Sequence, residues 1–442
     1  MGSAAGMAYE VRCPLHGSIA FNERERRLLD HPLVQRLRHI SQLGLAHLVF
    51  PGATHTRFSH CIGVMHLAGR IFDQIEPSLA EDDSFTREEL AYWRQVVRLA
   101  GLMHDLGHPP FSHTFEPLLP PKADLPLPGD WYRRLDPAQR STHEDFSVAA
   151  VYALAQESPP LLSPEEARDV CALIDDAVTP SQRLSPPRAD PRRVLYPVLK
   201  QIISGETDAD RMDYLRRDAH FAGVTYGHFD LERLIRSLSS AVTPQGRVMT
   251  LDHSGLYTYE NFLMARFHMA MQVYFHKTLM AFEYSLTRAV HEGEIAFTMD
   301  GTLENFLDAR EDAVTNLLHQ ARERPWASRI AGRRPLRRLL ELHEPPLRER
   351  RQEILDCLTD AAIPFVHIQE QRQLSTLGQE GVLPMLVRES TLGRLAHRPL
   401  SEVSGLLERY NQVFRIENVY CDAADFPAAV RVLQPLLGMV AP

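Results

Sequence analysis

Residues 104–113, HDLGHPPFSH, place an adjacent histidine and aspartate and two further histidines in one short segment. A neutral imidazole nitrogen and a carboxylate oxygen together suit Zn, Fe, Mn or Ni, and a metal with open positions can hold water beside a phosphate. His104 and Asp105 are therefore candidate metal ligands. An adjacent His-Asp pair is common in proteins, so this prediction depends on further ligands elsewhere in the chain.

The segment THTRFSHCIGVMHLAG, residues 54–69, supplies one such candidate, His60. Apolar residues follow it at helical spacing, at Val64, Leu67 and Ile71. This period predicts a helix with one buried face. We expect His60 to lie at the start of that helix, beside the buried face.

A second segment, TDADRMDYLRRDAHFAG at residues 207–223, contains Asp210, Tyr214 and Asp218. Side chains at i, i+4 and i+8 share one face of a helix. Two carboxylates and a phenol on one face are atypical of a core stripe, so a functional face is one interpretation. The alternative is a solvated face whose acids pair with Arg211 and Arg217.

The order His60, then His104-Asp105, then Asp210 resembles the H…HD…D signature of the HD-domain metal phosphohydrolases. The flanking sequences are similar to the branch that contains the dGTP triphosphohydrolases and the vertebrate SAM- and HD-domain dNTP triphosphohydrolases. These sequences are PLHGSI, HPLVQRLRHISQLGLAHLVFPGATHTRFSHCIGV, AGLMHDLGHPPFSH, STHEDFS and DADRMDYLRRD, within residues 9–290. The resemblance implies a helical bundle and a divalent transition metal (Mn, Fe, Zn or Ni) on those four residues, with Mg as a further ion on substrate phosphates.

Relatives in this branch hydrolyse dNTPs at the α-phosphorus and release a deoxynucleoside and intact tripolyphosphate, and the resemblance implies the same reaction here. The implied catalytic residues are His113, Glu116 and His143. The implied substrate contacts are Gln42, Leu43, Arg57, His108, Arg211, Tyr214, Asp218, Arg266, Tyr274 and Lys277. Among them, Asp218 matches the aspartate that holds the 3'-hydroxyl, and Tyr214 and Tyr274 match tyrosines that leave no room for a 2'-hydroxyl.

The chemistry of such a site can also be read from its residues. A bound metal would polarise a phosphoryl oxygen and lower the pKa of a bound water. The negative charge that develops on phosphorus needs cations, and the leaving oxygen needs a proton donor. Arg57 and Arg211 adjoin the proposed ligands in sequence, and His113 and His143 are the candidate proton carriers.

Four positions depart from the pattern of the branch. Glu116 replaces an aspartate, and Arg211 replaces a lysine. Ala270 and Phe275 stand where relatives have a histidine and a glutamine that help to hold phosphate and nucleoside. These departures bear on base preference and substrate length more than on the metal centre.

Several relatives are regulated by a nucleotide bound between subunits. Part of that site is matched here, at Asp30, Gln35, Arg38 and Arg233, whereas Arg12 and Cys13 replace an Asn-Asp pair. Large helical members of the branch commonly assemble as dimers, tetramers or hexamers. The resemblance therefore implies a homo-oligomer and leaves a nucleotide activator at a subunit interface open.

Composition is typical of a globular enzyme. The chain has 442 residues, 44% of them hydrophobic, and a formal net charge of -9 from 57 acidic against 48 basic residues. This balance argues against a general nucleic-acid coat, so a polyanionic substrate would need a locally basic pocket. The five cysteines lack CxxC spacing, and neither a signal peptide nor a membrane-spanning segment is evident. We expect a cytoplasmic protein without a membrane contact.

Apolar residues recur every three or four positions through most of the chain, which predicts a mostly helical fold. Gly107, Pro109 and Pro110 should end the helix that carries His104. Residues 118–140 and 181–193 are Pro-rich loops, and 242–251 predicts a hairpin. We expect an HD-domain core over residues 9–292.

After residue 292 the pattern changes, and we expect a smaller α+β region over residues 293–442. Residues 301–320 predict a short helix, and the Arg-rich residues 329–355 predict further helix. The β-branched and aromatic content of residues 362–371 and 414–422 predicts strands. The Arg-rich run could bind nucleic acid or an effector, but a solvated helix face paired with its own glutamates explains it more simply.

Other functions remain open from sequence. A ppGpp hydrolase would carry HDxxED where this chain has HDLGHPP, and a cyclic-dinucleotide phosphodiesterase would carry a GYP segment. A 5'-deoxynucleotidase acting on dNMPs is the nearest enzymatic alternative. The non-enzymatic alternative is a regulator that binds nucleotides or single-stranded nucleic acid, although a degenerate site would usually have lost one of the four ligands.

Overall fold

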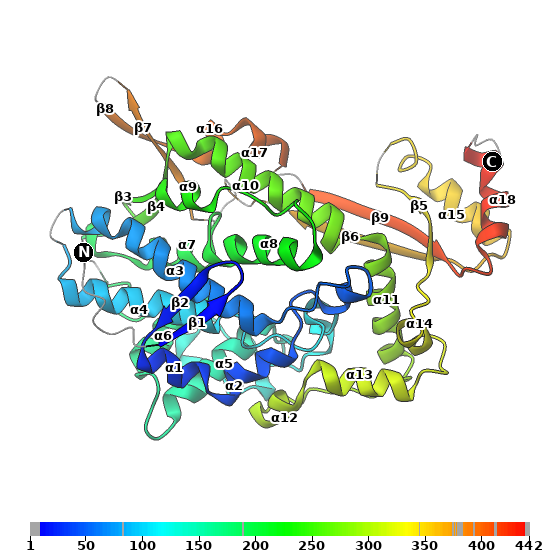
Figure 1. Cartoon of the computed structure of the whole chain (residues 1–442), viewed down its shortest axis with the longest axis horizontal. Helices are drawn as coiled ribbons and strands as arrows, with labels where there is room; N and C mark the ends of the chain where they lie inside the picture. The colour runs from blue at the N-terminus through cyan, green and yellow to red at the C-terminus, as the bar shows by residue number, and fades with distance from the viewer. Residues whose placement is uncertain are drawn as a thin grey trace.

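The computed structural model describes residues 9–81, 84–187, 190–343, 345–373, 375, 377, 383–391, 394–410 and 413–437. Most of these residues are helical, and a smaller α+β region follows the bundle, which confirms the predicted fold class (Figure 1). The bundle contains α1 (Glu23–Leu29), α2 (Pro32–Gln35), α3 (Arg57–Ala80), α4 (Arg87–Met103), α5 (His143–Gln156), α6 (Pro164–Ile174), α7 (Tyr196–Ile203), α8 (Ala209–Ala222), α9 (Leu231–Arg236), α10 (Leu256–Met269) and α11 (Lys277–His291).

Helices α3, α4 and α8 position the candidate metal ligands, and local sequence fixes their ends. Helix α4 starts with a capping box between Thr86 and Glu89 and ends at Met103, directly before His104, as the following glycine and prolines predict. Helix α8 is capped at its N-terminus by Asp208, whose side chain accepts a hydrogen bond from the Arg211 amide. It ends at Gly223 in the left-handed conformation, with a φ of 71°.

Two small sheets lie against the bundle. Strands β1 (Tyr9–Cys13) and β2 (Gly17–Phe21) form an antiparallel hairpin that the sequence did not predict. Strands β3 (Leu238–Thr243) and β4 (Gly246–Asp252) form the predicted hairpin. Strand β7 (Leu386–Thr391) pairs with β4 in parallel and with β8 (Arg394–Pro399) antiparallel, which extends this sheet with chain from far downstream.

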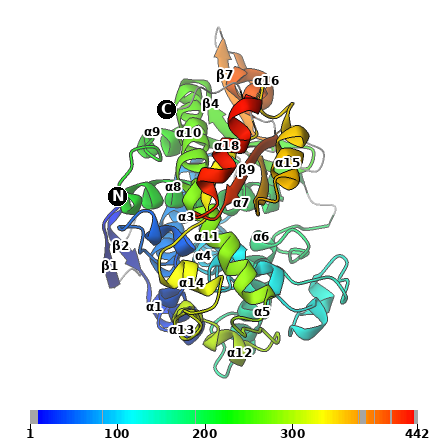
Figure 2. The ribbon, with the colours of Figure 1, turned by 90° about the vertical axis from the view of Figure 1, so that its right-hand side faces the viewer.

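Part of the C-terminal region forms a second layer at one end of the molecule, around β9 (Figure 1, Figure 2). Its sheet has the order β5-β9-β6, and two helices share an apolar cluster with it. The sheet also contacts the bundle at α11, where the Tyr420 hydroxyl of β9 donates a hydrogen bond to the Lys277 carbonyl oxygen at 2.9 Å. The elements of this layer are β5 (Arg337–Glu341), α15 (Arg351–Asp360), β6 (Val366–Gln373), β9 (Val413–Cys421) and α18 (Phe426–Leu437). Helices α16 (Leu400–Val403) and α17 (Gly405–Tyr410) lie elsewhere: α16 contacts β7 and β8, and Leu400 and Leu407 join the apolar core of the bundle.

Two predictions for this region were wrong in detail. The expected helix over residues 329–355 contains strand β5, because residues 337–341 pair with β9 and tertiary pairing overrides local helix propensity. The single helix expected over residues 301–320 is two helices, α12 (Leu303–Asp308) and α13 (Glu311–Gln320). The strands expected at residues 362–371 and 414–422 are confirmed as β6 and β9.

Residues after 292 also contribute to the core around the candidate site. Val314 and Leu318 of α13 are buried in one apolar cluster with Leu45, Phe111 and Phe115. Helix α14 (Ala327–Ala331) joins the same cluster. The division of the chain at residue 292 stays a prediction. Within the described residues, no helix combines the length and the apolar character that a membrane crossing needs.

Candidate active site and metal centre

The structure brings the four candidate metal ligands together. His60 comes from α3, His104 and Asp105 follow α4, and Asp210 comes from α8. The Asp210 Oδ1 atom lies 3.0 Å from His60 Nε2 and 3.6 Å from His104 Nε2. Asp105 contributes Oδ1 at 3.3 Å from His104 Nε2 and Oδ2 at 3.8 Å from His60 Nε2. Ligand atoms of His60, His104 and Asp210 therefore lie within 4.8 Å of one another, and Asp105 adjoins both histidines while also grouping with His108 and His143.

The two histidines are oriented as metal ligands. Their Nε2 atoms are buried, and neither forms a hydrogen bond with any described residue. Their other ring nitrogens are held: His60 Nδ1 lies 2.8 Å from Asp213 Oδ2, and His104 Nδ1 lies 2.9 Å from the Gly101 carbonyl oxygen. Metal-binding histidines almost always donate their second ring N–H to a carboxylate or a carbonyl. The residues present therefore fit a divalent metal.

Electrostatics also favour a cation at this position. Burial lowers the pKa of His60, but the contacts with Asp210 and Asp213 outweigh burial and raise it to about 10. Burial would raise the pKa of Asp210, but His104 and His60 hold it well below its usual range. The carboxylates thus attract positive charge to the site, and a bound metal would replace the proton on His60.

Asp213 contacts the ring nitrogen of His60 that faces away from the ligand cluster. The sequence analysis did not assign it a role. Its Oδ1 lies 2.6 Å from His16 Nε2, and Arg217 donates to both carboxylate oxygens, at 2.7 and 2.9 Å. The side chains of Asp213, His16 and Arg217 are all buried. The available signal was the spacing of Asp213 three residues after Asp210 and four before Arg217.

We expect Asp213→Asn to lower transition-metal affinity by about 10- to 100-fold, because carboxylates behind a metal-bound histidine set its orientation and basicity. Metal content after dialysis and titration calorimetry would measure the loss. Asp169→Asn is the matched control, because Asp169 is a buried carboxylate bonded to Ser181 away from the site. Equal metal affinity in the two variants would contradict the role of Asp213.

Two of the three candidate catalytic residues, Glu116 and His143, can be placed beside the metal ligands. His143, the first residue of α5, has its Nδ1 2.5 Å from Glu116 Oε1. Its ring stacks on His108 at 3.9 Å between centroids, and His108 Nε2 lies 3.2 Å from Asp105 Oδ1. His113 lies in the short helical turn Ser112–Thr114, but its side chain is outside the described part of the structure.

The two stacked histidines have opposite electrostatic environments. Burial lowers the pKa of His143, but Glu116 and neighbouring carboxylates raise it overall. Burial lowers the pKa of His108 well below its usual value, and the charge of Arg57 acts in the same direction. The environment of His143 therefore favours its protonated form more than that of His108 does.

The predicted phosphate-binding arginines are each paired with a carboxylate. Arg57 contacts Asp105 and donates to Ser112 Oγ at 3.1 and 2.7 Å. Arg211 pairs with Asp208, and Arg266 donates to Glu206 at 2.7 Å. Lys277 is exposed at the start of α11.

The predicted sugar contacts form a second group on α8 and α10–α11. The Asp218 carboxylate lies 2.8 Å from His55 Nε2 and accepts a hydrogen bond from the Tyr274 hydroxyl at 2.9 Å. The rings of Tyr214 and Tyr274 meet edge to face at 6.2 Å. His55 was not predicted, although it lies in the quoted FPGATHTRF segment.

The predicted nucleoside contacts Gln42 and Leu43 lie in the loop before α3. Leu43 is partly buried against the apolar core. The Gln42 Oε1 atom is buried and forms no hydrogen bond with any described residue. Because a buried amide without a partner is costly, this oxygen is suited to a ligand.

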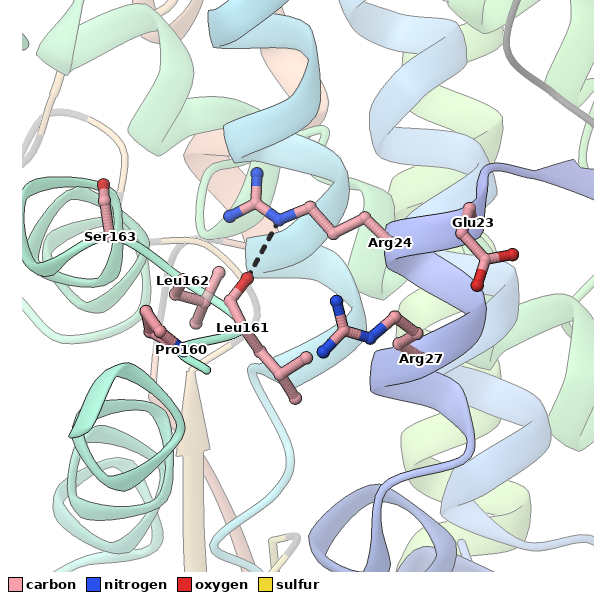
Figure 3. A pocket seen from close by; sticks show the side chains of 7 residues that line it. All are labelled: Glu23, Arg24, Arg27, Pro160, Leu161, Leu162 and Ser163. Carbon is pink, nitrogen blue, oxygen red and sulfur yellow. Dashed lines mark hydrogen bonds between the residues drawn. The ribbon is translucent and has the colours of Figure 1, made fainter. Parts of the chain in front are cut away.

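A separate surface pocket lies between α1 and the chain before α6 (Figure 3). It has a volume of about 450 Å³ and is lined by Glu23, Arg24, Arg27 and residues 160–163. Arg24 donates to the Leu161 carbonyl oxygen at 3.0 Å and pairs with Glu166. None of the predicted site residues lines this pocket.

Two segments of the chain, which together include most of the helical bundle, match models of known families. Residues 57–218 match the model of the HD domain, and residues 229–354 match the HD associated region. The first match contains all four candidate metal ligands. The second contains α9 to α14 and strands β3 to β5.

Two curated relatives illustrate the sequence similarity. The chain is 34% identical over 262 residues to the uncharacterized protein YwfO of Bacillus subtilis, covering 59% of this chain and 50% of that protein. It is 34% identical over 240 residues to the deoxynucleoside triphosphate triphosphohydrolase SAMHD1 of Homo sapiens, covering 51% of this chain and 35% of that protein. The chain thus spans half or less of the length of these two relatives.

Solved structures extend the likeness to nearly the whole chain. The crystal structure of a hypothetical protein from Aquifex aeolicus has a TM-score of 0.71 and 30% sequence identity, covering 96% of this chain and 99% of that one. A phosphohydrolase from Bacteroides thetaiotaomicron shares the fold, with a TM-score of 0.68 and 23% identity over 94% of this chain and 99% of that one. The chain therefore belongs to the HD-domain phosphohydrolase family, and part of its sequence is similar to deoxynucleoside triphosphate triphosphohydrolases.

Proposed function

We propose that the protein is a metal-dependent hydrolase that converts deoxynucleoside triphosphates to deoxynucleosides and tripolyphosphate. The observation that carries this proposal is the His143–Glu116 pair, stacked on His108 directly beside the cluster around Asp105. This arrangement combines a proton donor with a site for a divalent metal. The relatives of the same branch support the choice of substrate.

Each part of the site has a proposed task. When bound, the metal would polarise the α-phosphoryl oxygen and supply an activated water. His143, held in orientation by Glu116, would give its proton to the departing 5'-oxygen. His113 is the alternative proton carrier. Arg57, beside Asp105, would stabilise the charge that develops on the phosphoryl oxygens.

The binding of the triphosphate tail is proposed to be weaker than in relatives. Glu206 and Asp208 offset the charges of Arg266 and Arg211, so that these pairs attract a polyanion less than free arginines would. Ala270 and Phe275 add no polar contact. If these contacts are equal in ground and transition states, their weakness raises KM more than it lowers kcat.

We expect ribonucleotides to be poor substrates and Tyr274→Ala to reduce the preference for dGTP over GTP by at least about tenfold, because removal of the ring opens space for a 2'-hydroxyl. Tyr274→Phe is the matched control. It keeps the ring and removes only the hydrogen bond to Asp218, so it should retain the preference. Steady-state kinetics with both nucleotides measure the ratio. Equal turnover of GTP and dGTP by the unmodified protein would contradict the proposed contact.

Product analysis tests the proposed reaction. Each dNTP, alone and with the others present, would be incubated with metal-loaded protein, and the products separated by anion-exchange chromatography. Deoxynucleoside with intact tripolyphosphate is the expected result. Orthophosphate from dNMPs with dNTPs untouched would identify a 5'-deoxynucleotidase, the alternative that the paired Arg211 and Arg266 favour. Nucleotide binding without turnover would identify a regulator.

We further propose, from the resemblance, a cytoplasmic homo-oligomer that binds a nucleotide activator at a subunit interface. Two of the matched activator residues are joined, since Arg38 donates to Gln35 at 2.7 Å. The Arg38 guanidinium also lies 3.7 Å from the centre of the Phe58 ring. Arg12, which departs from the pattern, donates to Ser18 at 2.7 Å within the N-terminal hairpin.

A further inference from the structure

Glu311, the first residue of α13, connects two loops of the candidate site. Its Oε1 atom accepts hydrogen bonds from the amide of Ser41 at 3.0 Å and the amide of Phe111 at 3.1 Å. Its Oε2 atom accepts a hydrogen bond from the Ser41 hydroxyl. The partners lie 270 and 200 residues away in sequence. The carboxylate therefore does not cap its own helix but holds one loop against the other.

Each of these loops carries residues of the site. Ser41 directly precedes Gln42, whose buried Oε1 has no hydrogen-bond partner in the described structure. Phe111 directly precedes Ser112, whose hydroxyl accepts two hydrogen bonds from Arg57. Glu311 thus links the proposed nucleoside contact with the arginine that contacts Asp105.

The second loop has a conformation that needs support. Phe111 and Ser112 have φ angles of 55° and 50°, in the left-handed region that residues with side chains seldom adopt. Such residues persist only where the surroundings determine their conformation. The hydrogen bond from the Phe111 amide to Glu311 supplies part of that support.

A buried arginine ties the same segment to the loop independently. Arg36 donates to the carbonyl oxygen of His108 at 2.9 Å, and to those of Phe306 and Ala309 at 2.7 Å each. Residues 306–311 are therefore attached at both His108 and Phe111. All of them belong to the segment that matches the HD associated region.

We propose that Glu311 is a positioning residue for the hydrolase, which aligns the Gln42 loop with the Arg57–Ser112 contact. The proposal rests on the proposed function for its kinetic part and on hydrogen-bond geometry for the rest. The associated region then contributes to catalysis through a defined contact rather than through folding alone.

Glu311→Ala and Glu311→Gln test this role against a matched control. Glu294→Ala removes a similar carboxylate, which accepts hydrogen bonds from the amides of Trp326 and Ala327 away from the site loops. We expect Glu311→Ala to lower kcat/KM by about 100-fold, the order of loss expected from a misplacement of about 1 Å. Glu311→Gln keeps one acceptor oxygen and should fall between this variant and the unmodified protein. Glu294→Ala should leave kcat/KM per folded molecule unchanged, with bound metal equal in all four proteins.

Amide hydrogen exchange gives a readout that does not depend on the substrate. Faster exchange is expected in residues 41–44 and 111–115 of Glu311→Gln, and unchanged exchange there in Glu294→Ala. If exchange in both loops stays as in the unmodified protein, or if kcat/KM of both Glu311 variants stays within about threefold of it, the positioning role is wrong. Absence of dNTP turnover in the unmodified protein would instead reject the proposed function and leave the exchange test decisive for Glu311.

Discussion

The double variant His104→Ala/Asp105→Ala is expected to lose its bound transition metal and nearly all activity. The two residues provide ligand atoms on one side of the cluster, at 3.3 to 3.8 Å from one another and from the ligand atoms of His60 and Asp210. A metal supplies several kcal/mol of transition-state stabilisation, so kcat/KM should fall by at least about three orders of magnitude. Elemental analysis of the purified protein and dNTP turnover measure the two effects.

This variant also removes the carboxylate partner of Arg57, which retains its hydrogen bonds to Ser112. Circular dichroism should therefore confirm that the helical content is kept. His104→Gln/Asp105→Asn provides a milder pair with the same expected loss of metal. His291→Ala, at the exposed end of α11, is the control for losing a histidine. An undiminished metal content in the double variants would reject the ligand assignment.

The candidate metal ligands were assigned from the resemblance to the HD-domain signature, because the order His60, then His104-Asp105, then Asp210 matches it. His104 and Asp105 are adjacent, and helical spacing placed Asp210 on the same face as Tyr214. The residues behind them could not be assigned in this way. His16 reaches Asp213 across 197 residues of sequence, and Glu311 reaches Ser41 across 270. No periodicity relates such positions, and only the tertiary fold brings them together.

The same distinction applies to the secondary structure. Helices α3, α4 and α8 follow from apolar period, capping residues and the glycine and prolines after His104. Strand β5 could not be predicted, because residues 337–341 are arginines, leucines and a glutamate that favour helix locally. They become a strand because β9 offers a partner edge. The sequence also could not show that the predicted phosphate-binding arginines form ion pairs with carboxylates. Glu206 lies next to Arg266 only in the folded protein.

Glu116→Gln is expected to lower kcat by about 10²- to 10⁴-fold, the range attributed to a positioned general acid or base. In the structure Glu116 holds His143 through a contact of 2.5 Å and helps to raise the pKa of that histidine. The amide variant removes the charge and leaves the metal ligands unchanged. Metal content should therefore be retained, and KM should change much less than kcat.

The pH dependence of kcat should also change in Glu116→Gln, in a direction that follows from the role of His143. A general acid must be protonated, so activity falls as pH rises through the pKa of His143 in the enzyme–substrate complex. Because Glu116 raises that pKa, Glu116→Gln should move the basic limb of kcat to lower pH. Glu157→Gln is the control, since Glu157 contacts His31 at 2.8 Å in a similar pair on the surface. An unchanged basic limb in Glu116→Gln, with kcat equal to that of the control, would exclude His143 as the proton donor and leave His113 as the remaining candidate.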